Sequence, residues 1–351
     1  METIHEILAS QGHEIEFVTG NYPGAKKKWK GSYKKKFYGL NWNYLLSRIS
    51  FTLLANIHSM FCKSNVIVTV FSVYAPVFNF LYRKNVILEF YHLLGRKTVE
   101  KYGIFGWLPF FFEKIMLTNA KEIITMAPGT KQSVLDQYPD KKIHALPCGF
   151  DERQLELSPE NGKYVLVFGR IDIYMKGLDR LVPVMSKILE NNPGYRLVIA
   201  GRGSEEDIRK LRKIVANANL ESQTDIVINP EYSVKLELFR RCTYVAIFSR
   251  FEGWCIVAIE AAAAGKAILG VDVEGLRDSV VNGYNGVLID DFDVPKLIDI
   301  GSKLISDDLF RAGFEQNAQA HASQFTWLKI AEMQETVYKN FLEKKNELTA
   351  K

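Results

Sequence analysis

The sequence predicts an α/β protein with a doubly wound parallel sheet in each of two halves. Its 351 residues exceed the roughly 250–300 that one hydrophobic core usually holds. Short β-branched runs alternate with stretches of helical periodicity along most of the chain. Between the halves, residues 147–151 read Pro-Cys-Gly-Phe-Asp and a polar stretch follows at 152–162, which is typical of a crossing between domains.

The elements of the first half follow from these patterns. Helices are expected over 2–11 and 43–60, after Pro76, near Pro109 and over 129–137, with strands at 13–19, 65–73, 86–91, 122–126 and 142–146.

The second half alternates more regularly. Strands are expected at 164–168, 196–200, 225–228, 244–248, 267–271 and 287–289, and helices at 178–190, 204–217, 233–241, 254–264, 278–281, 293–306, 308–322 and from Trp327 onward. Ser204 followed by three acidic residues predicts an N-cap and an acidic first turn.

Composition narrows the function classes. Apolar residues make up 47% of the chain and charged residues 24%, as in ordinary soluble globular proteins. The net charge of +5 suits anionic ligands or an acidic membrane surface, and it is too small to indicate nucleic-acid binding. No apolar run reaches the length that spans a bilayer and no signal peptide is evident, so we expect a cytoplasmic protein, soluble or peripheral on the inner face of the membrane.

The cysteines give no sign of a metal site or a disulfide framework. Cys62, Cys148, Cys242 and Cys255 are scattered, without a C-x-x-C pair or a nearby histidine cluster. A reducing compartment is the expected environment.

Two segments of the first half allow two interpretations each. Residues 26–36 read KKKWKGSYKKK, which fits either a solvated loop or a patch for an anionic membrane or acceptor. Residues 102–117 are rich in aromatics, which fits either core packing or a surface for a membrane or lipid acceptor.

The stretch from Phe248 to Gly270 carries the main functional pattern. A strand end, a polar break, a turn at Glu252-Gly253 and a small-residue helix follow one another, and Gly265 stands where a left-handed cap is needed. Such a unit aims a helix N-terminus out of the carboxyl edge of the sheet, where anions bind. Glu252 and Glu260 could accept hydrogen bonds from sugar hydroxyls; alternatively, Glu252 helps to cap the helix and Glu260 is an ordinary helical residue.

Cations and a histidine are expected at comparable sheet edges. After the strand at 164–168, Gly169 permits a tight turn, and Arg170 and Lys176 suit a diphosphate and could stabilise charge on a leaving phosphate. In the first half, His92 stands just past the carboxyl end of the strand at 86–91, where ligands bind in α/β sheets.

These motifs together resemble a known family. GR-x(5)-KG, LVIAGRG, E-x(7)-E followed by AAAAGKAILG, D-x-x-G and NGYNG occur in the order and spacing of the retaining GT-B glycosyltransferases of family four, the group 1 transferases. The resemblance covers nearly all of 164–345 and is looser over 1–150. It implies two Rossmann-like domains facing each other across a cleft.

The resemblance also implies roles and boundaries. Catalytic roles fall to His92, Glu252, Arg170 and Lys176, and donor binding to Gly169, Arg170, Lys176, Gly201, Glu252, Gly253, Trp254, Cys255, Ile256 and Glu260. The implied domains are an acceptor-side domain at 1–150, a donor-binding domain at 151–325 and a helix at 326–351 that crosses back to the first domain.

The implied reaction transfers a sugar from a nucleotide-diphosphate sugar to a hydroxyl acceptor, in glycan, glycolipid or polysaccharide assembly, with retained anomeric configuration. Front-face displacement needs no dedicated base, and neither a cofactor nor a metal is implied. The D-x-D at 291–293 is interpreted as a solvated turn. The implied partners are the nucleotide sugar and an acceptor, with a lipid-linked acceptor and contact with an anionic membrane as options.

The sequence departs from the family pattern at two places. Cys255 stands where a glycine is usual, and the family's first strand and glycine-rich loop, expected before the helix at 2–11, are absent. The first domain is therefore expected to lack its usual first strand. Two alternatives remain: a catalytically impaired nucleotide-sugar-binding protein of the same fold, and a sugar-nucleotide epimerase.

Overall fold

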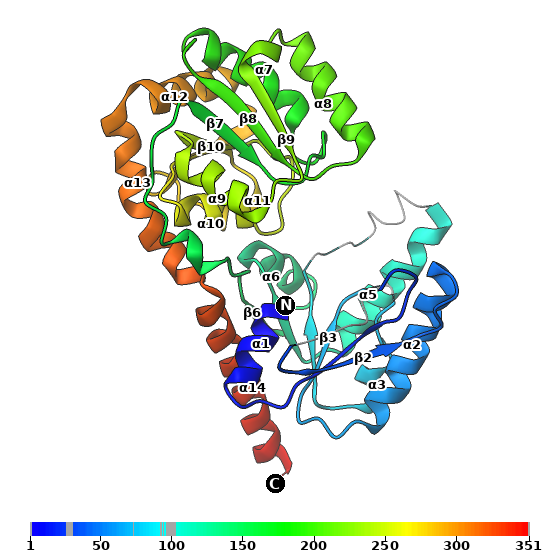
Figure 1. Cartoon of the computed structure of the whole chain (residues 1–351). Coiled ribbons are helices and arrows are strands. Elements are labelled where there is room, and N and C mark those ends of the chain that lie inside the picture. The colour runs from blue at the N-terminus through cyan, green and yellow to red at the C-terminus, as the bar shows by residue number, and fades with distance from the viewer. Residues whose placement is uncertain are drawn as a thin grey trace. The chain divides into compact units, whose positions relative to one another are not determined.

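The computed structural model describes residues 2–25, 31–72, 74–91, 93, 95 and 103–349. The chain forms two compact units, the first made of Met1–Pro147 with Trp327–Lys351 and the second of Cys148–Thr326 (Figure 1). Each unit has parallel strands with helices packed against them, which is the α/β architecture expected from the sequence.

The second unit contains a six-stranded parallel sheet in the order β12-β11-β10-β7-β8-β9. Its strands are β7 (Tyr164–Phe168), β8 (Arg196–Gly201), β9 (Thr224–Ile228), β10 (Tyr244–Ile247), β11 (Ile268–Val271) and β12 (Gly286–Ile289). Its helices are α7 (Leu178–Glu190), α8 (Glu205–Asn217), α9 (Tyr232–Arg241), α10 (Ile256–Ala263), α11 (Glu274–Arg277), α12 (Val294–Ser306) and α13 (Asp308–Ala322).

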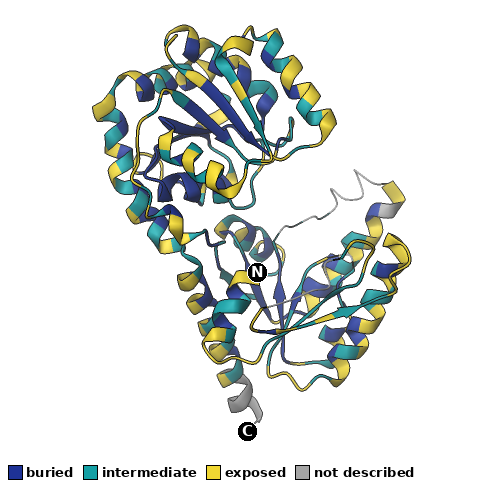
Figure 2. Ribbon diagram, viewed as in Figure 1, coloured by how far each residue is buried: buried dark blue, intermediate teal, exposed yellow. Residues whose placement is uncertain are grey.

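Both faces of this sheet are covered by helices, and most strand residues are buried (Figure 2). Successive residues of a strand point to opposite faces, so they pack in different clusters. In β7, Val165 and Val167 pack in the cluster that includes residues of α7, α8 and α12. Leu166, between them, packs in the other cluster with residues of α9 and α10. The near-continuous apolar strands of this half follow from that two-sided burial.

The first unit contains two separate parallel sheets, β1-β2 and β3-β4-β5-β6. The strands are β1 (Glu16–Gly20), β2 (Lys34–Tyr38), β3 (Ile67–Val70), β4 (Val86–Glu89), β5 (Glu122–Thr125) and β6 (Lys142–Ala145). The helices are α1 (Glu2–Ser10), α2 (Tyr44–Phe61), α3 (Asn79–Tyr82), α5 (Trp107–Asn119), α6 (Pro128–Leu135) and α14 (Trp327–Thr349).

Helix α14 belongs to the first unit although it follows the second in sequence. Val337 and Phe341 pack with Ile87 of β4 and Ile124 of β5. Another part of α14 packs against α1. The last helix therefore adds apolar cover to the first unit, on the side of β4 and β5.

A buried carboxylate joins α14 to β4. Glu89 accepts a hydrogen bond from Nε2 of Gln334 at 2.9 Å and from the hydroxyl of Tyr91 at 2.6 Å. Burial raises the pKa of Glu89, and both hydrogen bonds oppose that rise. These contacts help to fix α14 on the first unit.

Three elements differ from the sequence prediction. The basic segment at 26–36 ends in β2, whose Lys35 and Lys36 form ion pairs with Glu2 and Glu16 at 2.6 Å, so it is not wholly a loop. Its residues 26–30 lie outside the described part of the chain. The helical turn expected at 278–281 lies four residues earlier, as α11, and the first strand begins at Glu16 rather than at residue 13.

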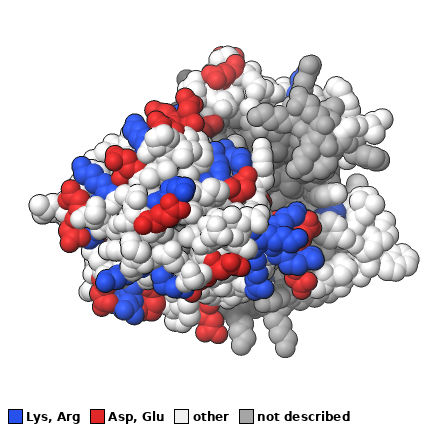
Figure 3. Space-filling view, turned by 90° about the horizontal axis from the view of Figure 1, so that it is seen from above, with Lys and Arg blue, Asp and Glu red and all other residues white. Residues whose placement is uncertain are grey.

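The described helices include none that is both long and apolar enough to cross a bilayer. On the face seen in Figure 3, blue lysine and arginine side chains are interspersed with red aspartate and glutamate side chains. Among the described residues on that face, neither sign forms a broad patch of its own.

Candidate active site

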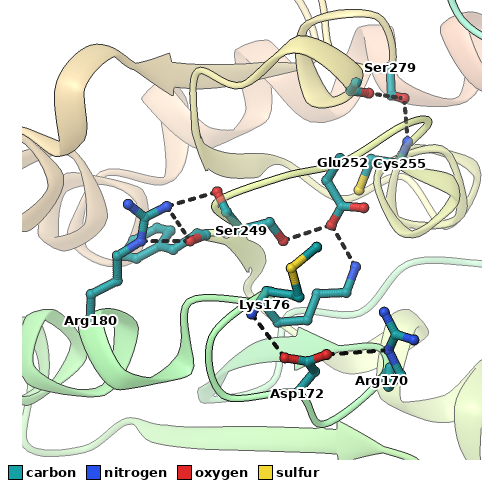
Figure 4. Close-up of polar contacts among 11 residues, drawn as sticks. Arg170, Asp172, Lys176, Arg180, Ser249, Glu252, Cys255 and Ser279 are labelled. Atoms are coloured by element: carbon teal, nitrogen blue, oxygen red, sulfur yellow. Dashed lines mark hydrogen bonds and ion pairs between the residues drawn. The ribbon is translucent and has the colours of Figure 1, made fainter. Parts of the chain in front are cut away.

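A recess lies at the carboxyl edge of the sheet in the second unit, where β7, β8 and β10 end (Figure 4). The loop after β7 contributes Gly169, Arg170 and Lys176 to its lining. The loop after β10 contributes Ser249 and Glu252, and the start of α10 contributes Cys255 and Val257. The topology thus brings the two sequence motifs, 76 residues apart at Lys176 and Glu252, to one place.

Glycine at position 201 is required by close contact between two loops. Its φ is 155°, and a Cβ there would lie 1.6 Å from the carbonyl oxygen of Gly169. The two loops run side by side, and Ile171 forms a parallel bridge with Gly203. Gly201 therefore lets the Gly169 loop settle at the edge of the sheet, and it shapes the site without contributing a side chain.

Glu252 is the centre of the polar contacts in the recess. Its Oε1 lies 2.6 Å from Nζ of Lys176 and 2.7 Å from Oγ of Ser249, which donates a hydrogen bond (Figure 4). The Glu252 side chain is 10% exposed and the Lys176 side chain 22%. The partners of this carboxylate are side chains of the two loops rather than the backbone of α10, so the alternative that Glu252 merely caps the helix is not what the structure shows.

Arg170 is much more exposed than Lys176. Its side chain is 68% exposed, and Nε lies 3.9 Å from Oδ2 of Asp172. The other oxygen of Asp172 accepts the backbone N–H of Met175 at 2.9 Å, so this carboxylate shapes the turn. Arg170 is therefore placed at the rim of the recess, where it can turn toward a ligand.

Arg180 of α7 anchors the loop that carries Ser249. Its guanidinium donates to the carbonyl oxygen of Phe248 at 2.7 and 3.0 Å and to that of Ser249 at 2.8 Å (Figure 4). It also stacks on the ring of Phe292, 4.4 Å from the ring centroid. Sequence reasoning missed Arg180, because an arginine in the first turn of an amphipathic helix has no distinguishing motif.

A second arginine, Arg250, lies in the loop after β10 itself and bonds to residues of the loop after β7 and of α7. Arg250 forms two hydrogen bonds of 2.7 Å with the carboxylate of Asp179 and donates to the carbonyl of Tyr174. Gly177 lies so close to this loop that a Cβ would meet the carbonyl oxygen of Phe248 at 2.2 Å. The loops after β7 and β10 are consequently held as one structure.

The start of α10 lies beside the recess, and its backbone is held by hydrogen bonds within the chain. Cys255 precedes the helix, and its side chain makes no N-capping hydrogen bond. Its backbone N–H donates to Oγ of Ser279 at 3.1 Å, and Ser279 donates onward to the carbonyl of Gly275 at 3.0 Å. Burial raises the pKa of the Cys255 thiol to about 12, so this thiol stays neutral.

Glu260 lies deeper, on α10, and has a lysine partner. Its Oε1 is 2.5 Å from Nζ of Lys235 on α9. Burial raises the pKa of Glu260, and the ion pair with Lys235 opposes that rise. Glu260 is thus not an ordinary exposed helical residue. No local motif singles out Lys235, because only the packing of α9 beside α10 brings the two side chains together.

Another group of side chains lies near Glu260. Tyr232 is hydrogen-bonded to Asp151, and the guanidinium of Arg153 lies 4.5 Å from the centroid of its ring. Arg153 holds the pKa of Asp151 at about 2, well below its ordinary value. Burial and the Asp151 hydrogen bond raise the pKa of Tyr232 to about 12.

Two remaining sequence predictions concern other parts of the chain. His92 lies outside the described residues. The D-x-D at 291–293 forms a turn, in which Asp291 has a φ of 49° and Asp293 caps α12 by accepting the N–H of Lys296. Within the described ranges, no group of three or more His, Cys, Asp or Glu side chains could hold a metal ion.

A comparison with protein families found a match that covers the residues of the recess. The model of the glycosyl transferases group 1 matches residues 150–321, which include every residue of the recess. Residues 150–321 of the chain therefore match the group 1 glycosyltransferases. The family expected from the sequence motifs is therefore confirmed.

Among curated proteins, this chain is similar to the phosphatidyl-myo-inositol mannosyltransferase of Mycolicibacterium smegmatis. The two are 28% identical over 191 residues, which are 54% of this chain and 48% of the relative. The matched region spans about half the length of the curated relatives found first.

Solved structures extend the likeness over both units. A sucrose-phosphate synthase from Thermosynechococcus elongatus has a TM-score of 0.78 at 19% identity, covering 97% of this chain and 92% of that one. HepE from Anabaena, solved with UDP and glucose, has a TM-score of 0.70 at 17% identity, covering 88% and 86%. The expected GT-B fold, with two Rossmann-like domains, is confirmed.

Proposed function

We propose that the chain is a retaining glycosyltransferase that moves a sugar from a nucleotide-diphosphate sugar to a hydroxyl acceptor. The observation that carries this proposal is the contact of Glu252 with Lys176 and Ser249 in the recess of the second unit. A carboxylate, a cation and a helix N-terminus at one sheet edge suit a ligand that joins sugar hydroxyls to a diphosphate.

The residues of the recess divide between the parts of the donor. Lys176 and Arg170 bind the diphosphate and stabilise the charge that develops on it as the sugar leaves. When the donor binds, Lys176 turns from Glu252 to phosphate, and Glu252 accepts hydrogen bonds from the sugar. The backbone from Gly253 to Ile256 lies over sugar and phosphate.

The nucleoside binds beside α9 and α10. Glu260 accepts the ribose hydroxyls, and the ion pair with Lys235 opposes the rise in the pKa of Glu260 that burial causes. Tyr232, with Asp151 and Arg153, lies near the nucleobase. HepE was solved with UDP and glucose, which favours a UDP-sugar as the first donor to test.

We propose a metal-independent reaction by front-face displacement. Two protein cations, Arg170 and Lys176, supply the positive charge that a diphosphate leaving group requires. The departing phosphate oxygen takes the acceptor proton, so no protein base is needed, and His92 contributes from the first domain. Because the reaction replaces one bond on the same face of the sugar, the anomeric configuration is retained.

The acceptor is proposed to be a hydroxyl presented at a membrane surface. The M. smegmatis relative is named for a phospholipid acceptor, phosphatidyl-myo-inositol. The basic stretch at 26–36 of this chain suits contact with anionic lipid. We therefore propose a cytoplasmic protein, peripheral on the inner face of the membrane, that acts in glycolipid or polysaccharide assembly.

A thermal-shift screen against UDP-, GDP- and ADP-sugars tests the donor site, with Lys176→Ala as the variant that should lose the shift. Free nucleotide and transferred sugar are then measured with candidate acceptors. Donor binding without turnover would favour a catalytically impaired binding protein. Nucleotide release without transferred sugar would favour an epimerase.

A further inference from the structure

Helix α2 exposes its apolar side chains on the surface of the first unit. The residues that it buries are small or polar: Ser47, Ala55, Asn56 and Ser59. The residues that it exposes are large and apolar: Leu45, Leu46, Ile49, Leu53, Leu54, Ile57, Met60 and Phe61. A surface helix of a globular protein normally has the opposite arrangement.

Hydrogen bonds on the inner side fix this orientation of α2. Oδ1 of Asn56 accepts the backbone N–H of Phe78 at 3.2 Å. The hydroxyls of Ser59 and Tyr82 lie 2.8 Å apart, and Tyr82 donates to the carbonyl of Asn56 at 2.7 Å. Rotating α2 to bury its leucines would break these bonds and leave polar groups unpaired, which is costly. The outward apolar face is therefore part of the folded state.

The apolar surface continues onto neighbouring elements. Helix α2 contacts α3, and α3 contacts α5. Further exposed apolar side chains are Leu40 and Trp42 before α2, Tyr44 at its first position, Phe78 and Leu81 at α3, and Trp107, Leu108 and Phe111 of α5. We call the exposed side chains of α2 and this set the α2 face. Soluble monomers rarely keep so many large apolar side chains together in water.

The sequence that contains α2 is strongly basic. From Phe17 to Leu88 the sequence contains no aspartate or glutamate. The same 72 residues contain eleven lysines and arginines: Lys26, Lys27, Lys28, Lys30, Lys34, Lys35, Lys36, Arg48, Lys63, Arg83 and Lys84. Arg83 donates to the carbonyl of Cys62 at 3.1 Å, which places Arg83 and Lys84 at the C-terminal end of α2.

We propose that the α2 face is the surface by which the first unit binds an anionic lipid bilayer. Its leucine, isoleucine and aromatic side chains enter the boundary between headgroups and acyl chains, and the surrounding cations meet the lipid phosphates. The helix lies in this interface, in agreement with the finding that no described helix can span a bilayer.

Charge favours lipid over a second copy of the chain. If two copies met through this face, exposed cations such as Lys63 and Lys84 would be brought toward their own copies, which disfavours association. A bilayer with anionic headgroups supplies both the apolar phase and the missing negative charge. The inference rests on the membrane contact proposed above and identifies the surface that makes it.

Vesicle flotation with the full chain tests the apolar contribution. The variant Leu45→Gln/Leu53→Gln/Ile57→Gln changes three exposed side chains of α2 and leaves its inner hydrogen bonds intact. Flotation with vesicles of phosphatidylcholine and phosphatidylglycerol should fall by about tenfold or more, because each change removes apolar area from the interface. The control is Leu309→Gln, at an 86% exposed leucine of α13 in the second unit, which should float like the wild type.

A second variant tests the charge contribution. Lys63 and Lys84 are exposed, whereas Lys35 and Lys36 are engaged in ion pairs. Lys63→Glu/Lys84→Glu should weaken flotation with the anionic vesicles and leave that with pure phosphatidylcholine unchanged. Lys296→Glu, on the exposed side of α12, should have no effect on either.

Two outcomes would overturn the proposal. In one, the triple glutamine variant floats as well as the wild type. In the other, light scattering shows that the wild type is a dimer and the triple glutamine variant a monomer, which would make the α2 face a contact between copies. Donor-induced thermal shifts are measured on the same variants, so that a failure of the donor site and a failure of membrane binding are seen separately.

Discussion

Nζ of Lys176 lies 2.6 Å from Oε1 of Glu252, and the hydroxyl of Ser249 donates to the same oxygen at 2.7 Å. The two charged side chains neutralise each other in a recess that is mostly shielded from water. A donor diphosphate offers Lys176 two or more negative oxygens in place of one carboxylate. On the proposed function, we expect donor binding to release Glu252 toward the sugar, whereas without donor the ion pair links the two loops.

Replacing either member of this pair should strongly reduce catalysis. We expect Lys176→Ala and Glu252→Ala each to lower turnover by about a hundredfold or more, the usual scale for removing one transition-state contact. Steady-state transfer assays with the donor identified by thermal shift measure this. Lys187→Ala, which removes an exposed lysine paired with Glu190, is the control. Turnover near the wild-type value in both site variants would contradict the assigned roles.

Arg180 should act as a positioning residue for the loop after β10. Arg180→Met keeps the length of the side chain but leaves the carbonyls of Phe248 and Ser249 without their donor. We expect the unfolding free energy to fall by about 1–3 kcal/mol and turnover to fall with it, because Ser249 and Glu252 lose their support.

Urea denaturation and transfer assays measure the two effects of Arg180→Met. Arg196→Met is the control, since Arg196 also donates several hydrogen bonds, to Asp225 and the carbonyl of Ser222, but on the exposed surface. Its loss should lower the unfolding free energy by about 0–1 kcal/mol. If Arg180→Met retained full turnover at a temperature where it is folded, the loop would not depend on this anchor.

The ion pair between Lys235 and Glu260 should make stability depend on pH. Burial already raises the pKa of Glu260 above its ordinary value of 4.5, and Lys235→Met would raise it further by removing the opposing charge. An acid with a raised pKa in the fold binds its proton more tightly when folded, so the fold loses stability as pH rises through that pKa.

The unfolding free energy of Lys235→Met should therefore fall further below that of the wild type at about pH 7.5 than at about pH 5. Urea denaturation at both pH values measures it, and Lys210→Met, which breaks an exposed pair with Glu206, is the control. An equal loss at both pH values would mean that Glu260 does not depend on Lys235 for its charge.

Gly201 should tolerate no side chain. In Gly201→Ala the new Cβ would overlap the carbonyl oxygen of Gly169, so the loops after β7 and β8 must separate. We expect a loss of about 3 kcal/mol or more in unfolding free energy, together with loss of the donor-induced thermal shift. Gly313→Ala, in open space on α13, should instead stabilise the chain by about 0.5–1 kcal/mol. Equal melting temperatures for the two variants would contradict this account.

Much of the second unit was predictable, because its elements are long or strongly patterned. Periodicity located α13 at its observed bounds, and Ser204 caps α8 as its position before three acidic residues indicates. The helical turn at 278–281 was wrong, since α11 is too short for periodicity to place. Strand β2 was missed because its run of lysines resembles a solvated loop.

The candidate site was predictable only in part. Motif spacing identified Lys176, Glu252 and Glu260, which the fold brings to α10 and the adjoining loops. Ser249, Lys235 and Arg180 carry no local signal, because each acts through a partner that is distant in the sequence or on another element. The orientation of α2 was equally hidden, since an apolar helix is ordinarily expected to bury its leucines.

The sequence by itself determined the fold class, the family and the residue types that could meet a nucleotide sugar. It did so because periodicity, glycines and spaced charges act through local backbone geometry. Only the tertiary structure decided which carboxylate pairs with which lysine and which face of α2 meets the surroundings. Those outcomes depend on contacts between distant segments, where burial and hydrogen bonding select one arrangement among several that the local sequence allows.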